Sequence, residues 1–387
     1  MKINLKKYLL YSSVFAIFTE AFFFHLIIDW KLFYLIIITN YILLIKFRKI
    51  TINKYFSYLL MAVACHSIIF NIIIGIPPNY FIAQLLGITV VSTFYYNLIP
   101  LYKTEQVISA YLKICLVVVI IGYLMLFLGL QNAYTNQLHS IFKEPAHYAV
   151  VVLPACYYFY KSKKYFLFLV VFCSLLLSKS SLGYIGCALI FIIPNLNFRR
   201  ILILLTTIPF IIYIGFLTYK NNDRVKLRVD DTISSLNSFN YGTFKADTNI
   251  SSYALMSNLF VTKSNVLDHP LGSGLGSHVY VHEHIYSKKI APPEYIKTLK
   301  LANINSNDAN SLFLRITSEF GILGLFLIFI FLYKYYSCFS AKELIMVQGV
   351  YIYILLKLIR DGHYFSPELF LFIWILYYSM KEKKESI

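Results

Sequence analysis

Long apolar runs separated by short polar segments cover most of this 387-residue chain. About 20 apolar residues in a helix cross the hydrocarbon core of a bilayer. By that measure twelve runs, a few of them short, are predicted to be transmembrane helices: 8–28, 32–46, 56–76, 80–101, 109–129, 147–160, 165–178, 182–198, 201–218, 311–333, 344–359 and 363–380. The pattern therefore predicts an all-α integral membrane protein with about twelve transmembrane helices.

One extended polar passage interrupts the apolar runs and divides the chain into three parts. Residues 1–218 are predicted to form an N-terminal bundle of about nine spans, 219–310 a large loop, and 311–387 a C-terminal group of about three spans. The shorter polar segment from Gln131 to Pro145 falls on the same side of the membrane as the large loop. We therefore expect these two polar segments to face one compartment.

Two stretches of the large loop have a readable periodicity. Apolar residues between Asp247 and Leu267 recur at helical spacing, which predicts a helix lying on the membrane surface or on other loops and ending at His269–Pro270. The following segment, 277–286, alternates so that its histidines share one face if it is extended. We expect a helix and then an extended segment.

The basic residues between the apolar runs indicate the orientation of the chain. Most of them fall on one side if the N-terminus is cytoplasmic. Few fall on the other side, chiefly Lys31, Lys143, Lys179 and Arg360. Both termini are therefore predicted to be cytoplasmic and the large loop to lie outside the cytoplasm.

Composition supports the membrane interpretation. The chain is 59% hydrophobic and 14% charged, whereas soluble domains are about one quarter charged. Its net charge of +17 lies mostly in the short inter-span segments, where it meets anionic lipid, so no nucleic-acid partner is expected. All six cysteines lie in or beside apolar runs, which argues against a disulfide framework. The halves of the chain show no repeat of the kind that transporters carry.

Ionisable residues lie at the start of the tenth predicted span. Ser311, Arg315 and Glu319 are spaced i, i+4 and i+8 and share one helix face. A charge at that depth costs about 2.5 kcal/mol or more unless it is paired or faces water. Arg315 and Glu319 are therefore either catalytic residues facing a cavity or an ion pair that locks two helices together.

A second candidate site precedes the sixth predicted span, where Lys143, Glu144 and His147 follow one another closely. A carboxylate beside an imidazole at a membrane interface can act as a general base toward a sugar hydroxyl. The alternative is an N-terminal cap in which the helix dipole favours Glu144 and Pro145 occupies the first turn. We take Glu144 and His147 as catalytic candidates and Lys143 as a substrate-binding candidate.

Two arginines open the large loop and a glycine-rich stretch lies near its middle. Arg224 and Arg228 are spaced i, i+4, and guanidinium groups suit pyrophosphate oxygens, although acidic neighbours make a solvated loop start an equal alternative. The glycines of 271–277 either let backbone N–H groups approach a phosphate or form a tight turn.

The loop histidines and the first span supply further candidates. His278, His282 and His284 lack a carboxylate on their face, so no metal site is expected, and His282 and His284 are kept as reserve bases or substrate-binding residues. Glu20 and His25 are expected to form an internal hydrogen-bonded pair.

In this order these features resemble the bacterial O-antigen polymerase family, which is related to the O-antigen ligases. The topology resembles that family along the whole chain, and three short motifs carry the resemblance at residue level. They are Ser140-Ile-Phe-Lys-Glu144-Pro145-Ala-His147, similar to the family's SxFxEPS; Leu177-Ser-Lys-Ser-Ser181-Leu-Gly183; and His269-Pro-Leu-Gly-Ser-Gly274-Leu-Gly276 followed by Asn310-Ser-Leu and Glu319-Phe-Gly321-Ile-Leu-Gly324-Leu.

The chain also departs from the family pattern. Ligases place a His-Asn pair nine residues before the glutamate, where this chain has Asn310-Ser311, so polymerase is favoured over ligase. An arginine common before the SxFxEP segment is absent, with Gln137 and His139 there instead. The pyrophosphate-binding role is left open among Arg224, Arg228, Arg315 and Lys143, with Asn310 as a further substrate-binding candidate.

The resemblance implies a fold like the C-type glycosyltransferases and a place in the bacterial inner membrane, with the large loop in the periplasm. It implies transfer of a growing glycan from undecaprenyl pyrophosphate to the non-reducing end of another lipid-linked repeat, without cofactor or metal. Partners would be these lipid-linked oligosaccharides, membrane lipid, and a chain-length regulator and flippase of the same pathway. The alternative functions are those of a flippase, a ligase or an inactive scaffold.

Overall fold

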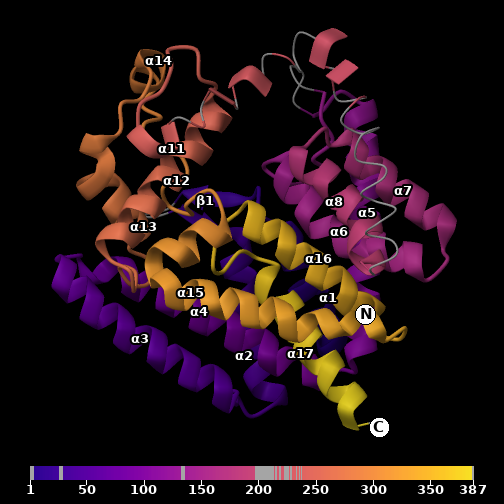
Figure 1. The fold of residues 1–387 in the computed structure, drawn as a ribbon. Helices are drawn as coiled ribbons and strands as arrows, with labels where there is room; N and C mark the ends of the chain where they lie inside the picture. The colour runs from indigo at the N-terminus through magenta and orange to yellow at the C-terminus, as the bar shows by residue number, and fades with distance from the viewer. Residues whose placement is uncertain are drawn as a thin grey trace.

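The computed structural model describes residues 4–25, 29–131, 136–196 and 238–385, with scattered positions between 213 and 236. It is all-α and 75% helical, as predicted (Figure 1). Four described helical stretches are long and apolar enough to cross a membrane: Lys54–Ile74, Pro78–Leu101, Thr104–Phe127 and Leu312–Ser340. The coarse prediction of a membrane protein built from helices is confirmed at that level.

Helices occupy eleven of the twelve predicted runs, and the ninth run, 201–218, lies almost entirely outside the described residues. The N-terminal helices are α1 Leu5–Phe15, α2 Leu32–Phe47, α3 Lys54–Ile74, α4 Pro78–Leu98, α5 Thr104–Phe127, α6 Pro145–Lys161, α7 Tyr165–Leu177 and α8 Ser181–Ile192. The C-terminal helices are α15 Leu312–Tyr336, α16 Ile345–Ile359 and α17 Leu369–Glu385. Helices α2, α7, α8 and α16 are apolar but shorter than 18 residues.

The prediction of one helix over residues 8–28 is wrong in its second half. Helix α1 passes into a 3₁₀ turn, η1 Ala16–Phe18, and the chain then forms an antiparallel hairpin of β1 Phe23–His25 and β2 Asp29–Lys31. The Thr19 hydroxyl donates to the Ala16 carbonyl at 2.7 Å and ends the helical turn. Glu20 then leaves the helix to pair with a distant histidine, which an apolar count cannot foresee.

Helices from the two ends of the chain pack together in one core. Helix α16 lies against α6 although nearly 200 residues separate them (Figure 1). Gly349 of α16 faces Pro154 of α6, and a Cβ there would lie 3.0 Å from the Pro154 carbonyl oxygen. Small residues permit such close helix contacts in membranes. This packing brings the segment before α6 next to the segment after α16.

The polar loop has its own helices and its own small core. Its described elements are α11 Ser238–Tyr241, α12 Ile250–Asp268, α13 His278–Tyr280, the π-helical turn η4 Val281–Tyr286, η5 Ser287–Lys289 and α14 Glu294–Thr298. Tyr253 and Val261 of α12 pack with Val281 and Tyr286 in this core. The loop lies at the upper left of the bundle in Figure 1.

One prediction for the loop is confirmed and one is wrong. The predicted helix is α12, whose N-cap Asn249 accepts from the Ser252 amide at 2.9 Å. The extended segment predicted over 277–286 is instead helical, because His278 and His282 are both buried at i, i+4 spacing. Residues i and i+4 share one face in both an extended strand and a helix, so the spacing of His278 and His282 does not distinguish the two.

The glycine-rich stretch 271–277 docks the polar loop onto the membrane helices. A Cβ on Gly272 would lie 2.4 Å from the Glu319 carbonyl group, and one on Gly276 would lie 2.4 Å from the Tyr80 carbonyl oxygen. The Gly274 amide donates to the Glu319 carbonyl oxygen at 2.8 Å. The Leu275 amide donates to the Ser67 hydroxyl at 2.8 Å. These two amides bind protein groups, so the contact is a tight backbone junction between the loop, α3, α4 and α15.

Candidate functional site

A cavity of ≈ 420 Å³ lies where the polar loop meets the helices that flank α6 and α16. Five separate stretches of chain line it: the N-terminal hairpin region, the segment before α6 together with the start of α6, the start of α8, the last part of the polar loop, and the segment after α16. Its lining residues are Glu20, Phe23, Lys31, Lys143, Glu144, Ala146, His147, Leu182, Asn305, Asn307, Asp308, Asn310, Arg360, Asp361 and His363. Four of the sequence-predicted residues, Lys143, Glu144, His147 and Asn310, meet there.

His147 is held in place by Glu20. Its Nδ1 lies 2.5 Å from Glu20 Oε1, which fixes the ring orientation and favours the imidazolium form. Glu144 and Asp361 are close enough to act electrostatically on the same ring. Glu20 thus pairs with His147, whereas the sequence had suggested His25 as its partner. The pair lines the cavity, so a positive charge at His147 faces its interior.

Glu144 is a free carboxylate at the cavity wall. It occupies the N-cap position of α6, before Pro145, as the capping alternative predicts. Its side chain, however, makes no capping hydrogen bond and is exposed. Among the described residues no ion pair engages it either. An unengaged carboxylate in this position is available to accept a proton from a bound hydroxyl.

Three cations in the cavity wall have no ion-pair partner among the described residues: Lys31, Lys143 and Arg360. Lys31 ends strand β2 and pairs in register with Phe23 of β1. Lys143 precedes α6, and Arg360 is the C-cap residue of α16. Unpaired cations that converge on one cavity are suited to bind an anionic ligand.

Asp361 connects the cavity to a buried hydrogen-bond network. Its Oδ2 accepts from Lys357 Nζ at 2.6 Å, and the same ammonium donates to the Ser366 hydroxyl at 2.7 Å and to Glu368 Oε1 at 3.3 Å. Tyr353 donates to Glu368 at 2.8 Å. Burial alone would raise the pKa of the Asp361 carboxyl, but the Lys357 ammonium lowers it below its usual value. Asp361 is therefore a fixed negative charge.

One group of side chains has the spacing of a metal site. Ligand atoms of Asp308, Asp361 and His363 lie within 4.8 Å of one another. Lys357 already binds Asp361, and His363 Nε2 lies 4.0 Å from Asp308 Oδ2. A cation there would compete with the ammonium of Lys357, so we assign the three residues to the charge network of the cavity wall.

Arg315 and Glu319 form a closed, buried pair behind the cavity. Arg315 Nε donates to Glu319 Oε1 at 3.1 Å and its Nη1 to the Gly362 carbonyl oxygen at 3.0 Å. The Tyr364 hydroxyl donates to Glu319 Oε2 at 2.8 Å, and the guanidinium lies over the Tyr364 ring. Arg315 is only 2% exposed and does not line the cavity. This geometry is that of the helix-locking alternative.

The other predicted residues lie elsewhere. His282 is fully buried in the polar loop, its ring centroid 6.2 Å from that of His278, and burial lowers its pKa to about 4. His284 is exposed and contacts the Tyr280 ring. Neither histidine lines the cavity. Arg224 and Arg228 lie outside the described residues.

Sequence reasoning missed several members of the cavity wall as functional residues: Glu20, Lys31, Asp308, Arg360, Asp361 and His363. A signal for two of them was present. Lys31 and Arg360 are among the few basic residues that the predicted topology places on the loop side of the membrane, against the positive-inside trend. Exceptions to that trend mark positions where a cation has a use other than setting the topology.

Comparison with known proteins adds no assignment: no protein-family model and no curated protein matches the chain.

Proposed function

We propose that this protein is a multi-pass membrane glycosyltransferase of the O-antigen polymerase kind, with about twelve spans and a C-type glycosyltransferase-like architecture. The observation that carries the proposal is the cavity. It joins the Glu144 carboxylate with three cations at the junction of the polar loop and the membrane helices, and none of these four groups has an ion-pair partner among the described residues. Glycan transfer from a lipid pyrophosphate needs this combination, because a hydroxyl must lose a proton while a pyrophosphate leaves.

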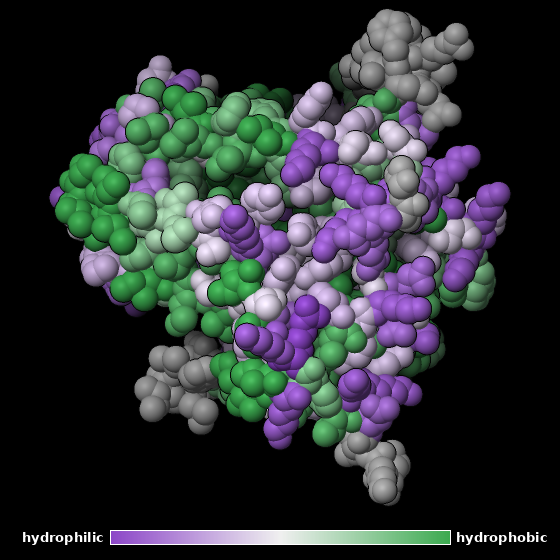
Figure 2. Space-filling view, turned by 90° about the horizontal axis from the view of Figure 1, so that it is seen from below, coloured by the Kyte–Doolittle hydropathy of each residue, from purple (hydrophilic) through white to green (hydrophobic). Residues whose placement is uncertain are grey.

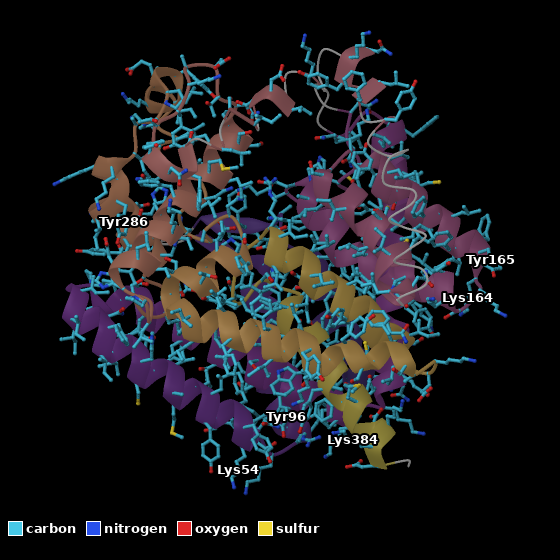
Figure 3. The ribbon with its side chains drawn as sticks, in the orientation of Figure 1. Lys54, Tyr96, Lys164, Tyr165, Tyr286 and Lys384 are labelled. Carbon is cyan, nitrogen blue, oxygen red and sulfur yellow. The ribbon has the colours of Figure 1, made fainter. Side chains whose placement is uncertain are left out.

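The distribution of side chains supports a bacterial inner-membrane orientation with both termini cytoplasmic and the polar loop periplasmic. Lys54 and Lys384 project from the lower end of the molecule, and Tyr286 of the polar loop lies at its side, well above them (Figure 3). Hydrophilic side chains cover much of the lower face (Figure 2). The position of Lys54 and Lys384 at the lower end is what the positive-inside trend favours for the cytoplasmic side.

In the proposed reaction the acceptor hydroxyl oxygen attacks the anomeric carbon of the donor glycan. The bond between that carbon and the pyrophosphate oxygen breaks, and undecaprenyl pyrophosphate leaves with the bonding electrons. Glu144 takes the proton of the hydroxyl. Lys31, Lys143 and Arg360, with the imidazolium of His147, oppose the negative charge on the leaving group before the bond breaks.

Two residue pairs act as positioning groups in this proposal. Glu20 holds His147 in its charged form and fixed orientation. Arg315 binds the Gly362 carbonyl, whose neighbours Asp361 and His363 line the cavity, so the Arg315–Glu319 pair sets the path of that segment. Neither Arg315 nor Glu319 touches substrate in this account.

Deleting the gene and running surface polysaccharide on a gel tests the proposal. Loss of a polymerase leaves the lipid core bearing a single repeat, because transport and ligation of one unit still proceed. Loss of a flippase or a ligase leaves core without any repeat, and that result would contradict the proposal. Restoration of the ladder by the wild-type gene on a plasmid is the control.

A further inference from the structure

The last part of the polar loop presents a rigid row of amides to the cavity. Asn305 Nδ2 donates to Asn310 Oδ1 at 2.9 Å, and the backbone N–H of Asn310 donates to Asp308 Oδ1 at 3.1 Å. Asn305 and Asn310 both adopt left-handed backbone conformations, with φ of 59°. The Asp361 amide donates to the Asn310 carbonyl at 3.2 Å and fastens this segment to the one after α16.

These hydrogen bonds leave other polar atoms of the same side chains without a partner among the described residues. Among the described residues, Asn305 Oδ1 and Asn310 Nδ2 have no hydrogen-bond partner, and neither side-chain polar atom of Asn307 has one. All three asparagines line the cavity. An amide offers both a donor and an acceptor, which matches the hydroxyls of a sugar ring.

The amide segment itself contributes no cation to the cavity wall. Asp308 and Asp361 accompany the amides, and these carboxylates repel a negatively charged ligand. The three free cations all come from other elements: the hairpin, the segment before α6 and the end of α16. The cavity thus offers cations to an anionic group and neutral amides to an uncharged one.

We propose that Asn305, Asn307 and Asn310 form the subsite for the terminal sugar of the acceptor, and that this sugar is uncharged. The inference rests on the proposed function and assigns binding of the acceptor to this segment. The cavity volume of ≈ 420 Å³ is near the lower end of the range for small-molecule pockets, about 300–1,000 Å³. It therefore encloses the reacting ends of the two substrates, and the remaining glycan extends outside.

Two-substrate kinetics of the purified protein in liposomes test the subsite. Asn307→Ala removes free amide atoms and leaves the Asn305–Asn310 bond in place, so the segment keeps its shape. We expect the KM for the acceptor to rise about tenfold, the effect of one or two lost hydrogen bonds, with the KM for the donor unchanged. Asn303→Ala is the matched control, because Asn303 is exposed nearby but does not line the cavity. An unchanged acceptor KM, or an equal rise for both substrates, would overturn the inference.

A binding measurement separates this inference from the proposed function. Saturation-transfer NMR with a soluble repeat oligosaccharide that lacks the lipid carrier should show contact with the wild type, and the contact should be lost in Asn307→Ala. An oligosaccharide ending in a uronic acid should bind more weakly than one with a neutral end, and equal or tighter binding overturns the neutral-sugar assignment. If wild type polymerises but Asn307→Ala behaves like wild type, only the subsite fails. If wild type binds the oligosaccharide yet transfers no glycan, only the proposed function fails.

Discussion

Replacing Glu319 with glutamine removes the charge that compensates Arg315 while keeping the shape of the side chain. Arg315 is 2% exposed and Glu319 is fully buried, so water cannot take the place of the lost carboxylate. Removing one partner of such a buried pair costs roughly 3–5 kcal/mol, because the other charge remains buried and unpaired. That loss is a large part of the stability of a typical domain.

The double variant Arg315→Met/Glu319→Gln removes both charges and completes a double-mutant cycle. Replacing both partners of a buried pair is often close to neutral. We therefore expect Glu319→Gln and Arg315→Met each to lower the unfolding temperature and the amount of protein in the membrane. The double variant should recover most of the stability, but it lacks the Arg315–Gly362 hydrogen bond, so it should form polymer more slowly than wild type.

Thermal unfolding in detergent, followed by intrinsic fluorescence, and a polysaccharide gel from cells measure the two outcomes. If the double variant folds like wild type and forms polymer at the wild-type rate, Arg315 does not set the path of the segment after α16, and its assignment as a positioning residue is wrong. If Glu319→Gln is as stable as wild type, the pair does not bear on stability and the burial argument fails.

Three further predictions concern the cation wall, the loop histidines and the loop junction. Lys143→Met should raise the KM for the pyrophosphate donor about tenfold and weaken its salt dependence, and an unchanged donor KM would remove Lys143 from the leaving-group site. Burial lowers the pKa of His282 to about 4, so the unfolded chain binds a proton near pH 6.5 that the folded loop does not. The stability present above pH 6.5 should then fall by up to about 1.4 kcal/mol per pH unit as the pH drops toward 4. His282→Leu should flatten this pH dependence, whereas His284→Leu, at an exposed position, should not. Limited proteolysis across this pH range measures the difference. Gly321→Ala should prevent folded protein from accumulating, since φ is +55° and the new Cβ would lie 2.0 Å from the Pro270 carbonyl oxygen, whereas Gly75→Ala, with φ of +79° and nothing within 4 Å, should cost only backbone strain. Similar membrane levels of the two variants would refute the argument.

Much of the helical architecture follows from the apolar runs, because a helix in hydrocarbon must satisfy its backbone internally. The helix α12 was also predictable from its spacing and its end at His269. The hairpin after η1 was not. Glu20, just before this hairpin, contacts His147, a pairing across more than 120 residues that local periodicity does not contain.

The candidate site was predictable in part. The segment around Glu144 was expected to face the same compartment as the polar loop, and Glu144 and Asn310 line the same cavity. Arg315 was expected to serve the chemistry because a charge in an apolar run is costly, but that cost is equally met by a partner such as Glu319. Spacing on one helix face shows that two charges can pair and does not show whether they also face a cavity.

The central claim is that Glu144 takes the acceptor proton in a cavity that polymerises lipid-linked glycan. The most direct measurement is chain elongation by purified protein in liposomes supplied with the lipid-linked repeat, comparing wild type with Glu144→Gln. Glu144 is exposed and makes no capping bond, so the variant should fold normally, and equal unfolding temperatures would verify this. The account predicts a ladder of products from wild type and none from Glu144→Gln. A ladder of equal length and rate from the variant would contradict it.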